Sequence, residues 1–177
     1  MRSSLIIFEY LDDDDISWIH KSCRKQHLRA GECLIEQGIL NKSIYLLLDG
    51  KCNAFAADGK KLGDLLMAGD MIGEVSFVDG RRTTARVVAL TDVVLAVLDH
   101  DVLSEHFEEE PAFAARFFQA VASVLAYRLR SNMQVRITGD QDIMNPTQEF
   151  SGEIDAIDLD GTARSGARLA NLIDRLL

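Results

Sequence analysis

The residues best suited to binding chemistry lie in the segment 69–85. A glycine turn opens the segment, the pair Gly73-Glu74 follows, and Val75 and Ser76 come next. This order offers backbone N–H groups and the N-terminus of a short helix to an anion. The Glu74 carboxylate stands where it could accept a hydrogen bond from a ligand hydroxyl. The first half of the segment therefore indicates a binding site for an anionic ligand.

The second half of the segment adds hydroxyl and guanidinium groups. After the turn at Asp79-Gly80 come two arginines, of which Arg82 is the second, and two threonines, Thr83 and Thr84. Guanidinium groups bind phosphate oxygens with strong, charge-assisted hydrogen bonds. An exposed pair of turn arginines is the competing interpretation of the same residues.

Composition excludes several classes of function. The chain has 177 residues and a net charge of −9, which fits one domain with an extension. Its acidity argues against sequence-independent DNA binding and against attraction to an anionic membrane. No apolar run approaches the roughly 20 residues of a membrane span, and the N-terminal apolar stretch is too short for a signal peptide. The sequence predicts a cytoplasmic protein without a nucleic-acid or membrane partner.

Cysteine and histidine give no metal or catalytic signal. Three widely spaced cysteines suit reduced thiols. His20, Cys23 and His27 have metal-like intervals, but basic residues surround them and a fourth ligand is missing. No Ser–His–Asp order, paired-carboxylate helix or phosphate-loop lysine stands out. We expect no metal, no cofactor and no enzymatic activity.

The elements that must position segment 69–85 are mostly short strands. Residues 5–22 have a helical pattern, and strand-like runs broken by glycine turns follow from residue 24. Short strands at this spacing are typical of an antiparallel sandwich or barrel. The predicted strands are 33–35, 44–48, 52–56, 62–66, 85–90 and 93–98.

The pattern becomes helical after Asp99. A short helix is predicted at 101–108, and a long one begins at Pro111 and continues to about Met133. Its wide apolar face either packs on the domain's own sheet or contributes in part to a dimer seam. That face consists of Phe117, Phe118, Val121, Val124, Leu125 and Leu129.

The C-terminal part differs in composition, so we divide the chain into a domain at 1–133 and an acidic extension at 134–177. The extension carries eight carboxylates against four arginines. An amphipathic helix is predicted within 162–177, and we expect it to dock through its apolar side chains. These are Leu169, Leu172, Ile173 and Leu176.

Segment 69–85 resembles the phosphate-binding cassette of the cyclic nucleotide-binding domain family, the family of the catabolite activator protein and the regulatory subunit of cyclic-AMP-dependent kinase. The likeness extends over residues 5–133, because the strand segments 29–38 and 43–50 also resemble family segments and occur in the same order. It implies a mainly β fold, an eight-stranded jelly-roll β-barrel with flanking helices, plus the long C-terminal helix and the tail.

The resemblance also implies roles for individual residues. The cyclic phosphate would lie on the N–H groups after Gly73, Glu74 would hold the ribose 2′-hydroxyl, and the long helix would close over the base. Thr83 stands where the family has its phosphate-clamping arginine, and Arg82 is one residue early. The implied ligand-binding residues are Gly73, Glu74, Val75, Ser76, Arg82, Thr83, Thr84 and, against the base, Asn132.

We therefore hypothesise a stand-alone, non-enzymatic cyclic nucleotide-binding regulatory protein of bacterial type. It would bind cyclic AMP or cyclic GMP and signal to a protein partner, or form a homodimer, through the long helix and residues 162–177. The alternative is a degenerate fold that acts as a structural or protein-interaction module without ligand. A transcription regulator is the weaker alternative, since 134–177 is too short and too acidic for a helix-turn-helix.

Overall fold

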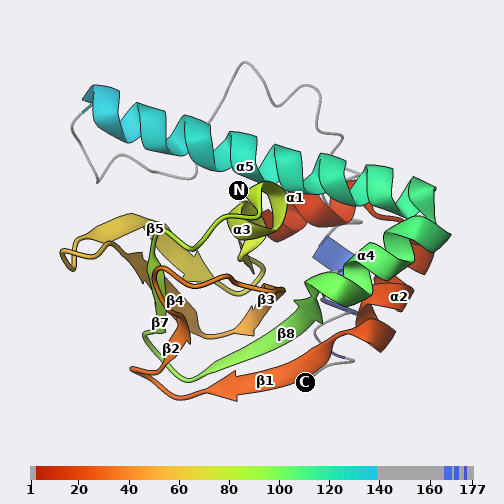
Figure 1. Ribbon diagram of the computed structural model, residues 1–177, viewed down its shortest axis with the longest axis horizontal. Coiled ribbons are helices and arrows are strands. Elements are labelled where there is room, and N and C mark those ends of the chain that lie inside the picture. The colour runs from red at the N-terminus through yellow and green to blue at the C-terminus, as the bar shows by residue number, and fades with distance from the viewer. Residues whose placement is uncertain (1–2, 139–165, 169, 172–173, 175–177) are drawn as a thin grey trace.

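The computed structural model describes residues 3–138, 166–168, 170, 171 and 174 (Figure 1). Two antiparallel four-stranded sheets form its centre. The first has the order β1 (Arg24–Leu28), β8 (Val93–Asp99), β3 (Ser43–Asp49) and β6 (Met71–Ile72). The second has the order β2 (Cys33–Ile35), β7 (Arg86–Ala89), β4 (Lys51–Phe55) and β5 (Lys61–Met67).

The two sheets enclose an apolar core to which both contribute. The central strands of the first sheet, β8 and β3, are apolar runs that are buried along most of their length. Strand pairing among the described residues stays within each sheet, so the sheets pack face to face and are not closed into a barrel. The core consists of Ile35, Leu47, Cys52, Ile72, Val87, Ala89, Val93, Leu95 and Val97.

The helical lead-in is two helices, α1 (Ser3–Tyr10) and α2 (Asp13–Ser22). Asp12 separates them because its carboxylate accepts hydrogen bonds from the Asp14 and Asp15 N–H groups, at 3.1 and 2.9 Å. The Asp15 carboxylate in turn accepts a hydrogen bond from the Asp12 N–H at 2.9 Å, which completes a capping box. The acidic run thus starts α2 rather than continuing α1.

The remaining helices are α3 (Glu74–Asp79), α4 (His100–Glu109) and α5 (Pro111–Thr138). Figure 1 shows α5 crossing the molecule above α1 and α3. Its buried face joins α1 in a second apolar core, so most of the predicted stripe packs inside the chain. Phe118 and Leu129 remain 45% and 57% exposed, and the dimer seam stays a prediction. The α5 residues in that core are Phe113, Phe117, Ala120, Val121 and Val124.

The prediction of a β-rich fold with flanking helices is confirmed, and each of the six predicted strands has a counterpart. β1 and β6 were missing from that set. The predicted jelly-roll barrel is not confirmed, because over the residues described the two four-stranded sheets are not closed on each other. The domain boundary at 133 stays a prediction. The apolar stripe of the tail, Leu169, Leu172, Ile173 and Leu176, lies outside the described residues. In the described part of the chain, no helix is long and apolar enough to cross a membrane.

Candidate functional site

The predicted cassette contains, at Gly73, a glycine that no other residue could replace without strain. Gly73 has a φ of 95°, and a Cβ there would lie 2.7 Å from the Ser43 carbonyl oxygen and 2.8 Å from Asn41 Nδ2. Asn41 is itself buried, and its amide donates to the Ser43 carbonyl at 2.6 Å. The turn into α3 is therefore fixed against the chain that leads into β3.

The N-terminus of α3 combines a buried carboxylate with accessible neighbours. Glu74 is 2% exposed, whereas the next residue, Val75, is 51% exposed and Ser76 is half-buried. The first N–H groups of an α-helix have no intrahelical acceptor. The N–H groups of this first turn are thus the natural donors for an anionic ligand group.

Glu74 is held by an arginine that sequence reasoning missed. The Arg128 guanidinium of α5 donates to Glu74 Oε1 through Nη1 and to the Met71 carbonyl at 2.6 Å through Nη2. The Glu74 side chain is 3% exposed and that of Arg128 28%. Burying a carboxylate is costly unless it is paired, so the Arg128 guanidinium offsets the cost of burying the Glu74 side chain.

A signal for Arg128 was present in the sequence. Arg128 follows Val121 and Val124 at helical spacing, on the face of α5 that is otherwise apolar and buried. A charged residue in such a stripe calls for a buried partner of opposite sign. The partner lies 54 residues earlier in the chain, which is why local patterns did not identify it.

The end of the cassette bonds to the loop between β2 and β3. Thr83 Oγ1 donates to the Glu36 carbonyl at 2.6 Å and accepts from the Ile39 N–H at 3.1 Å. The Arg82 guanidinium donates to the Gly38 carbonyl at 2.9 Å, and its side chain is exposed. In this arrangement both side chains hydrogen-bond to the loop rather than to the Glu74–Arg128 pair.

The two other predicted ligand residues are exposed. Thr84 follows Thr83 with its side chain open to solvent. Asn132 lies one helical turn beyond Arg128 on α5, and it is exposed as well. The structure thus places Gly73, Glu74 and the first turn of α3 together, with Asn132 on the adjoining helix.

Phe77 connects α3 to the C-terminal helices. Its ring lies 4.9 Å from that of His100 in α4, and 5.9 and 5.7 Å from those of Phe117 and Phe118 in α5, measured between centroids. A displacement of α3 would therefore disturb packing in α4 and α5.

The pKa of His100 is lowered by burial. The hydrogen bond with the Ser43 backbone and the charges of Asp101 and Asp99 oppose this effect.

Comparisons with known proteins place this geometry in a family. The model for the cyclic nucleotide-binding domain matches residues 25–110. Cyclic GMP-binding protein C of Dictyostelium discoideum is 29% identical over 104 residues, which are 57% of this chain and 4% of that protein. The cAMP-dependent protein kinase regulatory subunit of Aspergillus fumigatus is 38% identical over 72 residues, which are 41% of this chain and 17% of that protein.

A solved structure shows the same fold over most of the chain. The cyclic nucleotide-binding domain from Methylobacillus flagellatus KT has a TM-score of 0.69 at 20% identity, and the match covers 78% of this chain and 83% of that one. This chain spans at most 17% of the length of the two curated relatives described above. Residues 25–110 thus match the cyclic nucleotide-binding domain family in sequence, and the solved structure supports the fold.

Proposed function

We propose that this chain is a regulatory, non-enzymatic protein that binds a cyclic purine nucleotide, cyclic AMP or cyclic GMP, at the N-terminus of α3. The observation that carries the proposal is the Glu74 carboxylate. It is buried behind a turn that only glycine can make, and Arg128 holds it in place. A carboxylate in that position can accept the hydrogen bond of a ribose 2′-hydroxyl.

The phosphate would be held mainly by neutral donors. The N–H groups of Val75 and Ser76 and the hydroxyl of Thr84 take this role, because Thr83 stands in place of a clamping arginine. A hydrogen bond to a charged group contributes about 1.5–3 kcal/mol, so its loss weakens binding roughly 10- to 150-fold. We expect micromolar or weaker affinity.

The relatives support the class of ligand. The Dictyostelium protein is described as cyclic GMP-binding, and the Aspergillus protein is a regulatory subunit of a cAMP-dependent kinase. Carrying these ligands over to this chain is part of the proposal. So is signalling to a protein partner, or to a second copy, through α5 and residues 162–177, for which the Phe77 contacts with α4 and α5 offer a physical route.

A second candidate function is a ligand-free interaction module with the same fold. The bonds of Thr83 and Arg82 to the loop at 36–39 favour it, because they use the cassette's end to hold the fold together.

Calorimetric titration of the full chain separates the two. We expect saturable binding of cyclic AMP or cyclic GMP, no comparable binding of 5′-AMP, and loss of binding in Glu74→Gln. Glu108→Gln, an exposed change of the same type on α4, is the matched control and should bind like the parent. No heat and no shift in melting temperature with either cyclic nucleotide would favour the ligand-free module.

A further inference from the structure

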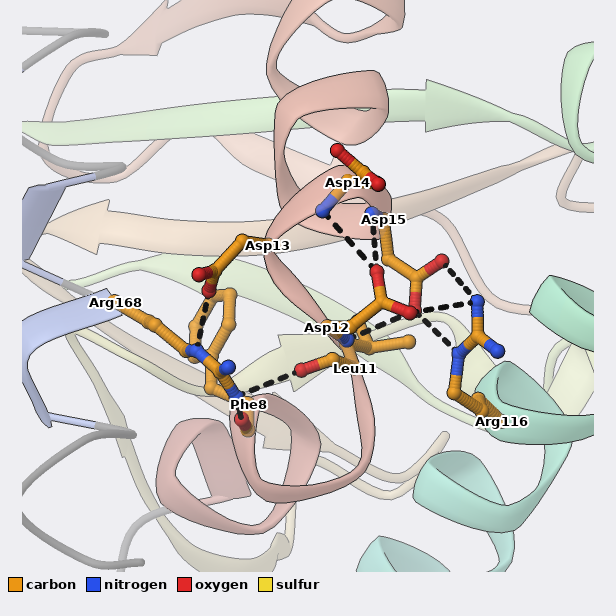
Figure 2. Close-up of polar contacts among 8 residues, drawn as sticks. All are labelled: Phe8, Leu11, Asp12, Asp13, Asp14, Asp15, Arg116 and Arg168. Atoms are coloured by element: carbon orange, nitrogen blue, oxygen red, sulfur yellow. Dashed lines mark hydrogen bonds and ion pairs between the residues drawn. The ribbon is translucent and has the colours of Figure 1, made fainter.

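Arg168, one of the described residues of the tail, contacts the corner between α1 and α2 (Figure 2). Arg168 Nη1 donates to the carbonyl oxygens of Phe8 and Leu11 at 3.0 and 2.9 Å, and its Nε donates to Asp13 at 2.8 Å. The last carbonyls of a helix lack intrahelical donors and carry partial negative charge. The C-terminal end of α1 therefore presents a site that suits a guanidinium group.

A second arginine reaches the same corner from the opposite side, as Figure 2 shows. Arg116 of α5 makes two bonds of 2.7 Å to the Asp15 carboxylate and lies 3.0 Å from that of Asp12. The Asp15 carboxylate is shielded from solvent at 4% exposure, whereas the Arg116 side chain is 34% exposed. The corner is thereby tied to the N-terminal half of α5.

The other half of α5 is tied to the candidate site by the Arg128–Glu74 pair. Between the two ties, Phe8 and Leu11 share one buried core with Phe117 and Val121 of α5. A chain of direct contacts thus runs from Arg168 through the corner and α5 to Glu74. All of these contacts are present together in the one structure.

We propose that the α1–α2 corner is a docking site for the chain's own C-terminal segment, with Arg168 as the anchor, and that docking is coupled through α5 to the Arg128–Glu74 pair. The sign of the coupling is positive, because both contacts are made in one position of α5. Only the link to nucleotide affinity rests on the proposed function. There, reciprocity requires that nucleotide and docked segment strengthen each other by the same factor.

The anchor is tested by limited proteolysis of the full chain with chymotrypsin, whose cleavage sites the arginine variants leave intact. Arg168→Ala should speed cleavage within the tail at least about tenfold, since three hydrogen bonds from a charged donor are lost. Arg168→Lys should fall in between, because an ammonium group cannot reproduce the fork. Asn171→Ala, an exposed change on the same segment, should cleave like the parent.

Two further results of this experiment decide the details. Asp13 is 85% exposed, so Asp13→Asn should change cleavage by less than about threefold if the helix carbonyls are the main acceptors. Equal cleavage of Arg168→Ala and the parent would overturn the docking. A dimeric parent that becomes monomeric in Arg168→Ala, by light scattering, would assign the corner to a second copy and overturn docking within one chain.

The coupling is tested without nucleotide by Arg128→Gln, read at the tail. Coupling along packed networks typically changes an equilibrium about 2- to 30-fold, and we expect faster tail cleavage by a factor in this range. Arg130→Gln, an exposed change on the same helix, should have no effect. The double variant Glu74→Gln with Arg128→Gln guards against general destabilisation and should also cleave faster. Parental rates in both Arg128 variants would overturn the coupling.

Binding of cyclic AMP provides the last test of the coupling. Saturating cyclic AMP should slow tail cleavage, and Arg168→Ala should weaken cyclic AMP binding by the same factor. A slowed tail with unchanged affinity in Arg168→Ala would contradict the coupling. If the parent binds no cyclic nucleotide, the proposed function fails, while the cleavage results for Arg168 and Arg128 still decide this proposal.

Discussion

The Glu74–Arg128 pair makes a prediction about stability that can be worked out from the structure. Replacing Arg128 by Gln removes the cation from a carboxylate whose side chain is 3% exposed. Breaking a buried ion pair from one side costs about 3–5 kcal/mol. Arg128 is 28% exposed, so water can partly replace it, and we expect a loss of about 3 kcal/mol at the lower end of that range.

Urea denaturation at neutral pH measures this loss directly. For a chain of this size each kcal/mol lowers the melting temperature by about 2–4 °C, so a fall of roughly 6–12 °C should accompany the change. Glu74→Gln with Arg128→Gln should be less destabilised than Arg128→Gln alone, because no buried charge is then left unpaired. Arg130→Gln, exposed on the same helix, should stay within about 0.5 kcal/mol of the parent.

The same single and double variants can also refute the claim that Arg128 supports the buried Glu74 carboxylate. If Arg128→Gln unfolds within about 0.5 kcal/mol of the parent, the pair does not support the buried carboxylate. The same conclusion follows if the double variant is as unstable as the sum of the single variants, because contacting residues should show a coupling energy of about 0.5–3 kcal/mol.

Three further outcomes follow from the same structure. In thermal melts, Gly73→Ala should lower stability by more than the roughly 1–2 kcal/mol that a left-handed residue costs, because its Cβ would meet the Ser43 carbonyl. Gly59→Ala is the control and should lose less, since Gly59 has a φ of 81° and open space around it. Thr83→Arg should tighten cyclic nucleotide binding about tenfold or more in calorimetry while lowering stability by about 1 kcal/mol, since its loop bonds are lost; unchanged affinity would count against a phosphate at this position. The folded-state pKa of His100 is lowered from 6.5, so this half-buried residue contributes stability above that pH that is lost as the pH falls below it. Denaturation curves should show this dependence of stability on pH in the parent and a weaker one in His100→Gln, and identical slopes would argue against this role of the ring.

Local sequence signals were enough to predict six of the eight described strands and the turn into the cassette. Glycine turns and short apolar runs depend on nearest neighbours, and Gly73 occupies the left-handed position that its place in the pattern indicates. The start of α2 was also encoded locally, because the run from Asp12 to Asp15 can cap a helix N-terminus, and the structure forms a capping box there.

The interactions that fix the candidate site are long-range, and the sequence did not reveal them. Arg128 pairs with a residue 54 positions away, and Arg168 reaches carbonyls more than 150 positions away. Thr83 was evaluated as a missing clamp, whereas its hydroxyl bonds to the loop at 36–39. Such pairings depend on which elements pack together, and local patterns in a single sequence do not reveal that packing.

The central claim is that a cyclic nucleotide binds at the first turn of α3, and amide chemical shifts test it most directly. In a nitrogen-15-labelled full chain titrated with cyclic AMP and cyclic GMP, the Val75 and Ser76 amides should shift saturably with at least one of them. They should not do so with 5′-AMP, or in Glu74→Gln. Unmoved Val75 and Ser76 amides at saturating nucleotide, or saturable shifts confined to residues away from α3, would contradict the account.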